Sequence, residues 1–88
     1  MANKIKTKSG FSCEVDLKSI EDDYELLELL SNLEDDPLVI VKIAKKVLGE
    51  ESYTRLKEHL RKDGQISTSG MTEELTEIMQ SIQQLKNS

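Results

Sequence analysis

The sequence predicts an α+β fold that is mostly helical: a short N-terminal β-hairpin followed by about four α-helices, in a single domain of residues 1–88. Apolar and polar residues alternate between residues 4 and 16, as they do in strands with one buried face. From residue 21 onward, apolar residues recur at the spacing of helix faces. Turn-forming residues separate these segments, at Gly10, Pro37, Gly49 and Gly64.

The predicted hairpin covers residues 4–16. Ile5, Phe11, Cys13 and Val15 fall on one face of the two strands, with polar residues between them. Gly10 lies between the two runs and tolerates the positive φ of a tight turn. An isolated hairpin is marginally stable in water, so we expect its apolar face to rest on the helices.

The first predicted helix covers residues 21–33. Ser19 precedes Asp22 by three positions, which resembles a capping box, and acidic residues crowd the first turn. Its apolar residues cover more than one stripe, so we expect this helix to be central in the fold. They are Tyr24, Leu26, Leu27, Leu29, Leu30 and Leu33.

Two further helices are predicted over residues 37–48 and 50–62. Asp36 suits an N-cap and Pro37 suits the first helical position, while Gly49 is a natural stop. The helix over 37–48 is apolar on a wide arc. The helix over 50–62 has a narrower stripe that predicts a surface position, formed by Tyr53, Leu56 and Leu60.

The last predicted helix covers residues 71–85 and has the cleanest amphipathic pattern in the chain. At 100° per residue its apolar side chains fall within about 120° of one face. They are Met71, Leu75, Ile78, Met79, Ile82 and Leu85. Such a face covers either the domain's own core or another chain.

Composition and charge favour a soluble, cytoplasmic protein. Of the 88 residues, 36% are hydrophobic, and the longest apolar run is too short to span a bilayer. Cys13 is the only cysteine, so the sequence indicates no disulfide framework. Residues 19–41 hold eight acids and no base, whereas residues 42–62 hold seven bases and three acids. These blocks indicate complementary neighbours within the fold or a surface that attracts a basic partner.

The sequence indicates no catalytic, cofactor or metal site. His59 is the only histidine, and it would serve as a base only if the fold brought a serine, a threonine or Cys13 beside it. One histidine and one cysteine are too few for a zinc site. Cys13 lies on the predicted apolar face, where burial keeps the thiol pKa from falling. We therefore expect a protein that is not an enzyme.

Nucleic-acid binding is an alternative, because residues 37–48 and 50–62 also fit a helix-turn-helix. Arg55, Lys57, Arg61 and Lys62 would then contact phosphates. Two acids, Glu50 and Glu51, stand at the start of the would-be recognition helix and oppose that interpretation. An adaptor that binds another protein is a further alternative.

Taken over nearly its full length, the chain resembles the small tail assembly chaperones of long-tailed bacteriophages and prophages. The resemblance is carried by an "ELLELL" helix, an acidic break before "PL", a "KVLGEESYTRLKEHLR" segment and a final "MTEELTEI" helix. It implies a non-enzymatic factor that binds the tape-measure protein, with tail-tube subunits as further partners. The family also implies that this chain is the short product of a gene pair joined by a −1 frameshift.

We expect such a client to bind in an apolar groove between the last helix and the helix over 50–62. Wide apolar arcs on several helices exceed what one thin core absorbs, and an amphipathic helix or a second copy of the chain would cover the surplus. The candidate partner-binding residues are Tyr53, Leu56, Leu75, Ile78, Met79 and Ile82. The acids at 22, 23, 25 and 28 would attract lysine-rich stretches of the client.

Overall fold

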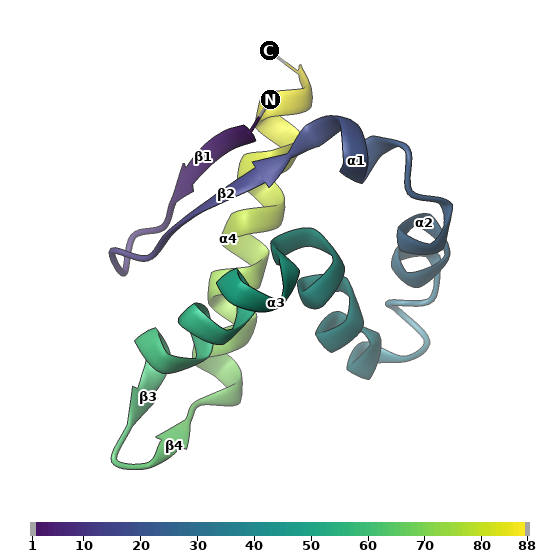
Figure 1. Cartoon of the computed structure of the whole chain (residues 1–88). Coiled ribbons are helices and arrows are strands. Elements are labelled where there is room, and N and C mark those ends of the chain that lie inside the picture. Colours follow the sequence, from purple (N-terminus) through teal and green to yellow (C-terminus); the bar gives the residue numbers. More distant parts are fainter. Residues whose placement is uncertain (1, 88) are drawn as a thin grey trace.

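The chain begins with an antiparallel hairpin of β1 (Ala2–Lys6) and β2 (Ser12–Asp16), seen in the computed structural model, which describes residues 2–87 (Figure 1). Ile5 pairs with Cys13 in the strand register. The four alternating apolar residues predicted to share a face are all buried, each at most 4% exposed. Gly10 adopts φ 96° in the connecting turn, as its position predicts.

The acidic segment after the hairpin forms two short helices, α1 (Leu17–Glu21) and α2 (Tyr24–Ser31), where the sequence predicts one helix over 21–33. Asp16 caps α1 by accepting hydrogen bonds from the backbone N–H groups of Lys18 and Ser19. Asp23 caps α2 through the N–H of Leu26. The predicted cap at Ser19 is therefore wrong, because two aspartates flanking α1 compete successfully for the caps.

A short 3₁₀ helix, η1 (Pro37–Val39), leads into α3 (Ile40–Leu60). Asp36 caps η1 by accepting from the N–H of Leu38, as the sequence predicts. Gly49 interrupts α3 with φ 82° and ψ 160°, so the two predicted helices are present as two segments joined at a sharp bend. This bend turns the second segment back beneath the hairpin (Figure 1).

Gly49→Ala is expected to lower the free energy of unfolding by about 1–3 kcal/mol, because non-glycine residues rarely adopt this φ/ψ region. A Cβ at Gly49 meets nothing within 4 Å, so the cost arises from the backbone conformation alone. Gly70→Ala is the matched control, since Gly70 is helical and a Cβ there has ordinary contacts with Ser67. Urea denaturation followed by circular dichroism measures both. Equal stability of the two variants would contradict the conformation at Gly49.

The segment after α3 is a second, minimal hairpin of β3 (Arg61–Lys62) and β4 (Gln65–Ile66). Asp63 and Gly64 both have positive φ, 53° and 78°, as the two central residues of a type I′ turn require. The prediction of helix through residue 62 is wrong at this end, because the strand pairing begins at Arg61.

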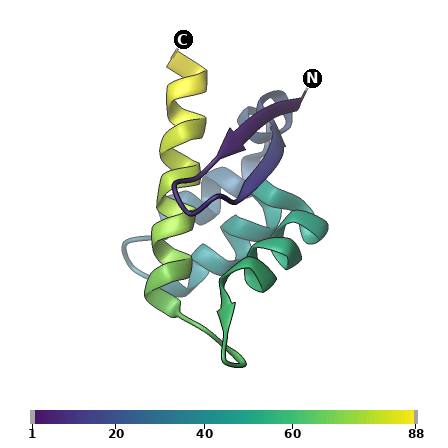
Figure 2. The ribbon, with the colours of Figure 1, turned by 90° about the vertical axis from the view of Figure 1, so that its left-hand side faces the viewer.

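The last helix, α4 (Thr68–Asn87), starts three residues earlier than predicted. Ser67 accepts a hydrogen bond at Oγ from the N–H of Gly70, 3.1 Å away, and thereby caps the first turn. The helix runs the length of the molecule, with the β1–β2 hairpin and α3 on the same side of it (Figure 2).

One hydrophobic cluster joins the hairpin, α2, α3 and α4, and its fully buried side chains are Ile43, Leu56 and Ile78. The predicted fold class, mostly helical α+β with an N-terminal hairpin, is confirmed. The expected central position of the first helix is wrong. Within α2 only Leu26 is buried, and Leu27 on its other side is 59% exposed.

Candidate functional site: an apolar groove between α2 and α4

Four of the six predicted partner-binding residues are buried, and they do not form the predicted groove between α3 and α4. Leu56, Leu75, Ile78 and Ile82 are each at most 5% exposed. They belong to the same hydrophobic cluster as the inner face of the hairpin, which packs on α3 and α4. The surplus apolar surface expected between α3 and α4 is thus covered by the chain's own N-terminal strands.

The other two predicted residues, Tyr53 and Met79, are half-buried at the edge of the cluster. The ammonium groups of Lys45 and Lys57 lie 5.8 Å and 5.3 Å from the centre of the Tyr53 ring. These cations cover the Tyr53 ring and stabilise it as part of the α3 surface. Met79 lies elsewhere, in the wall of an open groove that the sequence did not predict.

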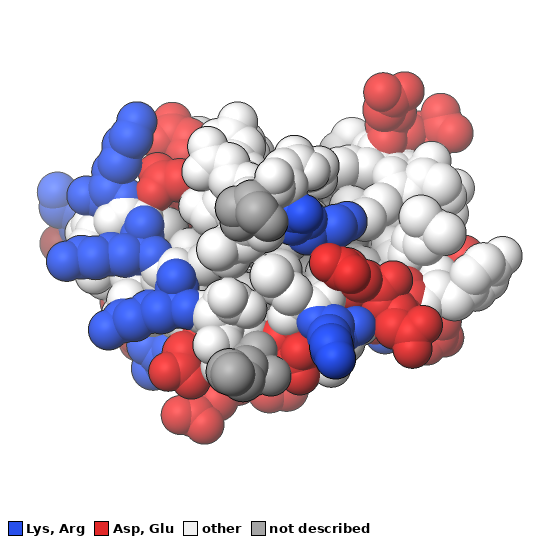
Figure 3. All heavy atoms as spheres, turned by 90° about the horizontal axis from the view of Figure 1, so that it is seen from above, with Lys and Arg blue, Asp and Glu red and all other residues white. Residues whose placement is uncertain are grey.

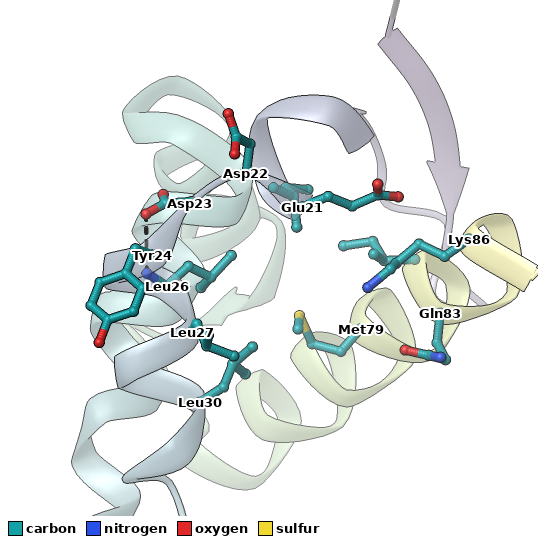
Figure 4. A pocket seen from close by; sticks show the side chains of 12 residues that line it. Glu21, Asp22, Asp23, Tyr24, Leu26, Leu27, Leu30, Met79, Gln83 and Lys86 are labelled. Carbon is teal, nitrogen blue, oxygen red and sulfur yellow. Dashed lines mark hydrogen bonds between the residues drawn. The ribbon is translucent and has the colours of Figure 1, made fainter.

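This groove, called the α2–α4 groove below, has a volume of about 340 Å³. Its apolar lining comes from three helices (Figure 4). The lining residues are Ile20 of α1, Tyr24, Leu26, Leu27 and Leu30 of α2, and Met79 and Ile82 of α4. Polar residues complete the rim: Glu21, Asp22, Asp23, Gln83 and Lys86.

The groove is open because α2 has apolar residues on two faces. Leu26 is 2% exposed and Leu29 packs partly against the core. Leu27 and Leu30, one position further along in each case, are turned away from the core and remain 59% and 38% exposed. In Figure 4 these two side chains point into the space that Met79 faces from α4, while the Tyr24 ring stands at the outer edge.

Asp23 fixes α2 against α3. Its carboxylate accepts from the N–H of Leu26 at 3.1 Å and forms an ion pair with Lys46 of α3, also at 3.1 Å. The capping hydrogen bond and then the Lys46 contact hold the pKa of Asp23 below its ordinary value. The same carboxylate raises the pKa of Lys46. The α2 wall of the groove is therefore held against α3 by Asp23, which lies at the start of α2.

The contribution of Asp23 to stability is expected to depend on pH. The pKa of Asp23 is lower in the folded state than in the unfolded state, where it is about 3.9. The stabilising contribution is therefore fully present at pH values above the unfolded-state pKa, and it is lost as the pH falls through the folded-state pKa. Asp23→Ala should therefore unfold at a lower urea concentration than wild type at neutral pH. The difference between the two urea midpoints should disappear at acid pH. Asp22→Ala is the control, and a gap of constant size down to acid pH would contradict the role of the charged carboxylate.

The fold does bring a serine beside His59, at the tip of the β1–β2 hairpin. Ser9 Oγ lies 3.1 Å from His59 Nε2, but Ser9 donates its proton to Glu74 Oε1 at 2.9 Å. Thr7 donates to the same carboxylate oxygen at 2.7 Å. In a catalytic triad the carboxylate accepts a hydrogen bond from the imidazole, and the serine hydroxyl donates its proton to the imidazole. Here the Glu74 carboxylate accepts hydrogen bonds from the hydroxyl groups of Ser9 and Thr7 instead, so the network joins the hairpin turn to α4.

The thiol of Cys13 is buried within the hairpin's inner face, 3% exposed. Burial raises its pKa, and the nearby Arg55 offsets only part of this effect. The expectation that the pKa does not fall is confirmed, and the thiol behaves as a small apolar side chain.

Three of the four basic residues in the helix-turn-helix interpretation have partners within the chain, and one of them is Lys57, which lies over the Tyr53 ring. Arg55 donates to the carbonyl oxygen of Ser12 at 3.2 Å and lies over the Phe11 ring. Arg61 forms an ion pair with Glu58 at 2.8 Å. These guanidinium groups join the hairpin to α3 and secure the end of α3, and a phosphate would have to compete with those contacts.

Charges are divided across the molecule (Figure 3). Lys and Arg side chains project on the left of this view, the side of the β1–β2 hairpin, and Asp and Glu predominate on the right, toward α1 and α2. The α2–α4 groove thus opens beside the acidic part of the surface.

Within residues 2–87, no three His, Cys, Asp or Glu side chains are grouped as a metal site would require. None of the helices in the same range combines the length and the apolar character needed to cross a bilayer. Comparison with protein-family models, with curated proteins and with solved structures found no match for this chain.

Proposed function

We propose that this chain is a non-enzymatic assembly chaperone of the phage-tail type, which binds a helical segment of a tape-measure protein in the α2–α4 groove. The resemblance of the sequence suggests the class of client. The observation that carries the proposal is the open groove itself, with Leu27 and Leu30 exposed on a helix whose opposite face is buried.

The lining of the groove suits one amphipathic helix. Its two long walls are helices, its lining is mainly apolar, and its rim is polar. Helix α2 has eight residues and is about 12 Å long, so it would contact about two turns of a client helix. Met79 suits such a surface, since an unbranched thioether side chain adapts to partners of different shape.

A small contact surface also fits the release that a chaperone requires. Interfaces that bury less than about 1,200 Å² in total are typical of weak and transient complexes. A client helix held over two turns would dissociate when tail-tube subunits offer it a larger surface. The stable, buried core beneath the groove would remain unchanged during this exchange.

Co-expression tests the proposal. The tape-measure protein encoded in the same genome is produced alone, with this chain, and with the Leu38→Asp variant, which alters an exposed leucine outside the groove. We expect the client to be insoluble alone and soluble with either form of the chain. A client that stays insoluble with the wild-type chain would contradict the proposal.

A binding assay with duplex DNA separates this function from the alternative of a DNA-binding regulator. The proposal predicts no retention on DNA even at low salt. Retention that weakens steeply with salt and is lost in the Arg55→Glu, Arg61→Glu double variant would instead favour the regulator.

The gene offers an independent test of the proposed class. A slippery heptamer across the codons for Leu85, Lys86 and Asn87, opening into an overlapping −1 frame, would support a frameshifted gene pair. A mutated heptamer that leaves the longer product unchanged would contradict the frameshift.

A further inference from the structure

The rim of the α2–α4 groove carries more negative than positive charge. Glu21, Asp22 and Asp23 border it on the side of α1 and α2, and Lys86 is the one basic residue in its lining. The Asp23 carboxylate already accepts a hydrogen bond from the N–H of Leu26 and forms an ion pair with Lys46. The exposed carboxylates of Glu21 and Asp22 have no hydrogen bond or ion pair with the described residues 2–87.

Glu21 lies within reach of an occupant, and Asp22 stands at the outer end of the groove with its carboxylate pointing outward. In Figure 4 the Glu21 side chain extends along the upper end of the groove toward α4, and Lys86 extends from α4 on the opposite side. Leu27, Leu30 and Met79 lie below them. A helix resting on these three apolar side chains would present one flank to the acids of the α1–α2 wall.

A second copy of this chain is a poor occupant of the groove. A two-fold contact would bring the same acidic rim against itself, in a chain whose formal net charge is −5. Tyr24, Leu27 and Leu30 together expose apolar surface on the order of a few hundred Å². A stable dimer buries about 800 Å² on each partner.

We infer that the groove selects an amphipathic helix whose apolar stripe is flanked by Lys or Arg on the side that meets Glu21 and Asp22. The inference rests on the proposed function and specifies the chemistry of its client segment. The apolar stripe provides the contact with Leu27 and Leu30, and the basic flank provides selection and faster association.

Two labelled peptides of about 18 residues, long enough to form a helix of about 27 Å, serve as probes. Both carry leucine at positions i, i+3, i+4 and i+7, and they differ only in having lysine or glutamate along one flank. Fluorescence anisotropy with the full chain measures their affinities at about 0.02 M and about 0.5 M salt, where the Debye lengths differ several-fold.

We expect the basic peptide to bind at least about tenfold more tightly than the acidic one at low salt, with the ratio approaching one at high salt. The Glu21→Lys, Asp22→Lys double variant should reverse the preference. The matched control is the Glu34→Lys, Asp35→Lys double variant, which makes the same charge change at exposed residues outside the groove. It should keep the preference of the wild type.

Several results would overturn the inference: equal affinities at low salt, no binding of either peptide, or a preference that Glu21→Lys, Asp22→Lys leaves unchanged. The inference would also be overturned if the free chain formed a dimer and the Leu27→Asp substitution abolished it, since a second copy would then fill the groove. A client kept soluble by a chain that does not discriminate the peptides would refute this inference and leave the proposed function intact. Discrimination without client rescue would refute the proposed function alone.

Discussion

Replacing Leu56 with alanine is expected to lower the free energy of unfolding by about 2–5 kcal/mol. Leu56 is 0% exposed and lies on the second segment of α3, in the cluster shared with the hairpin and α4. A domain of this size has a total stability of only about 5–10 kcal/mol, so the variant should be close to unfolded at 37 °C. Urea denaturation at 25 °C followed by circular dichroism gives the difference.

Leu38→Ala is the control for this loss, because Leu38 is 78% exposed and removal of an exposed side chain changes stability by less than about 0.5 kcal/mol. A loss below about 1 kcal/mol in Leu56→Ala would mean that the site is not packed as the structure shows. The comparison also tests the assignment of Leu56 to the core, where the sequence predicts a partner-binding role.

Leu27→Asp is expected to weaken client binding strongly while leaving stability within about 0.5 kcal/mol of wild type. Leu27 is 59% exposed in the free chain, so a carboxylate there stays hydrated until a client arrives. Binding would then bury an unpaired charge in an apolar groove, and central interface residues typically contribute about 2 kcal/mol or more. Affinity should fall at least about tenfold, and co-expressed client should return to the insoluble fraction.

Leu38→Asp makes the same chemical change on an exposed leucine outside the groove, and it should rescue the client as wild type does. Thermal unfolding of both variants separates lost binding from lost structure. Rescue by Leu27→Asp at wild-type level would place the client elsewhere on the chain.

Local signals in the sequence predict most of the elements. The alternation of apolar and polar residues in residues 4–16 indicates strands with one buried face, whichever element covers that face. Gly10 and Gly49 mark positions where a positive φ is required. The Asp63–Gly64 pair is an equally local signal, typical of a type I′ hairpin turn. Arg61 and Lys62 ahead of Gly64 are equally typical of a helix C-terminus, and the prediction of helix to residue 62 follows that signal.

The site depends on long-range packing, which periodicity does not determine. In "ELLELL" both faces of the helix carry leucine, so the pattern cannot show that Leu26 turns inward and Leu27 outward. The stripe through Leu75 and Ile78 is equally compatible with a core and with a partner, and the hairpin decides between them by covering it. Of the predicted binding residues, Met79 and the buried Ile82 line the observed groove.

Photo-cross-linking in cells that co-express the tape-measure protein tests the groove as the client site most directly. A benzophenone amino acid is placed at Leu27 or Gln83, in the two walls, and at Leu38 or Lys6, outside the groove. We predict cross-links to the client from the two groove positions and none from the other two. Cross-links from Leu38 or Lys6 with none from Leu27 and Gln83 would contradict the account.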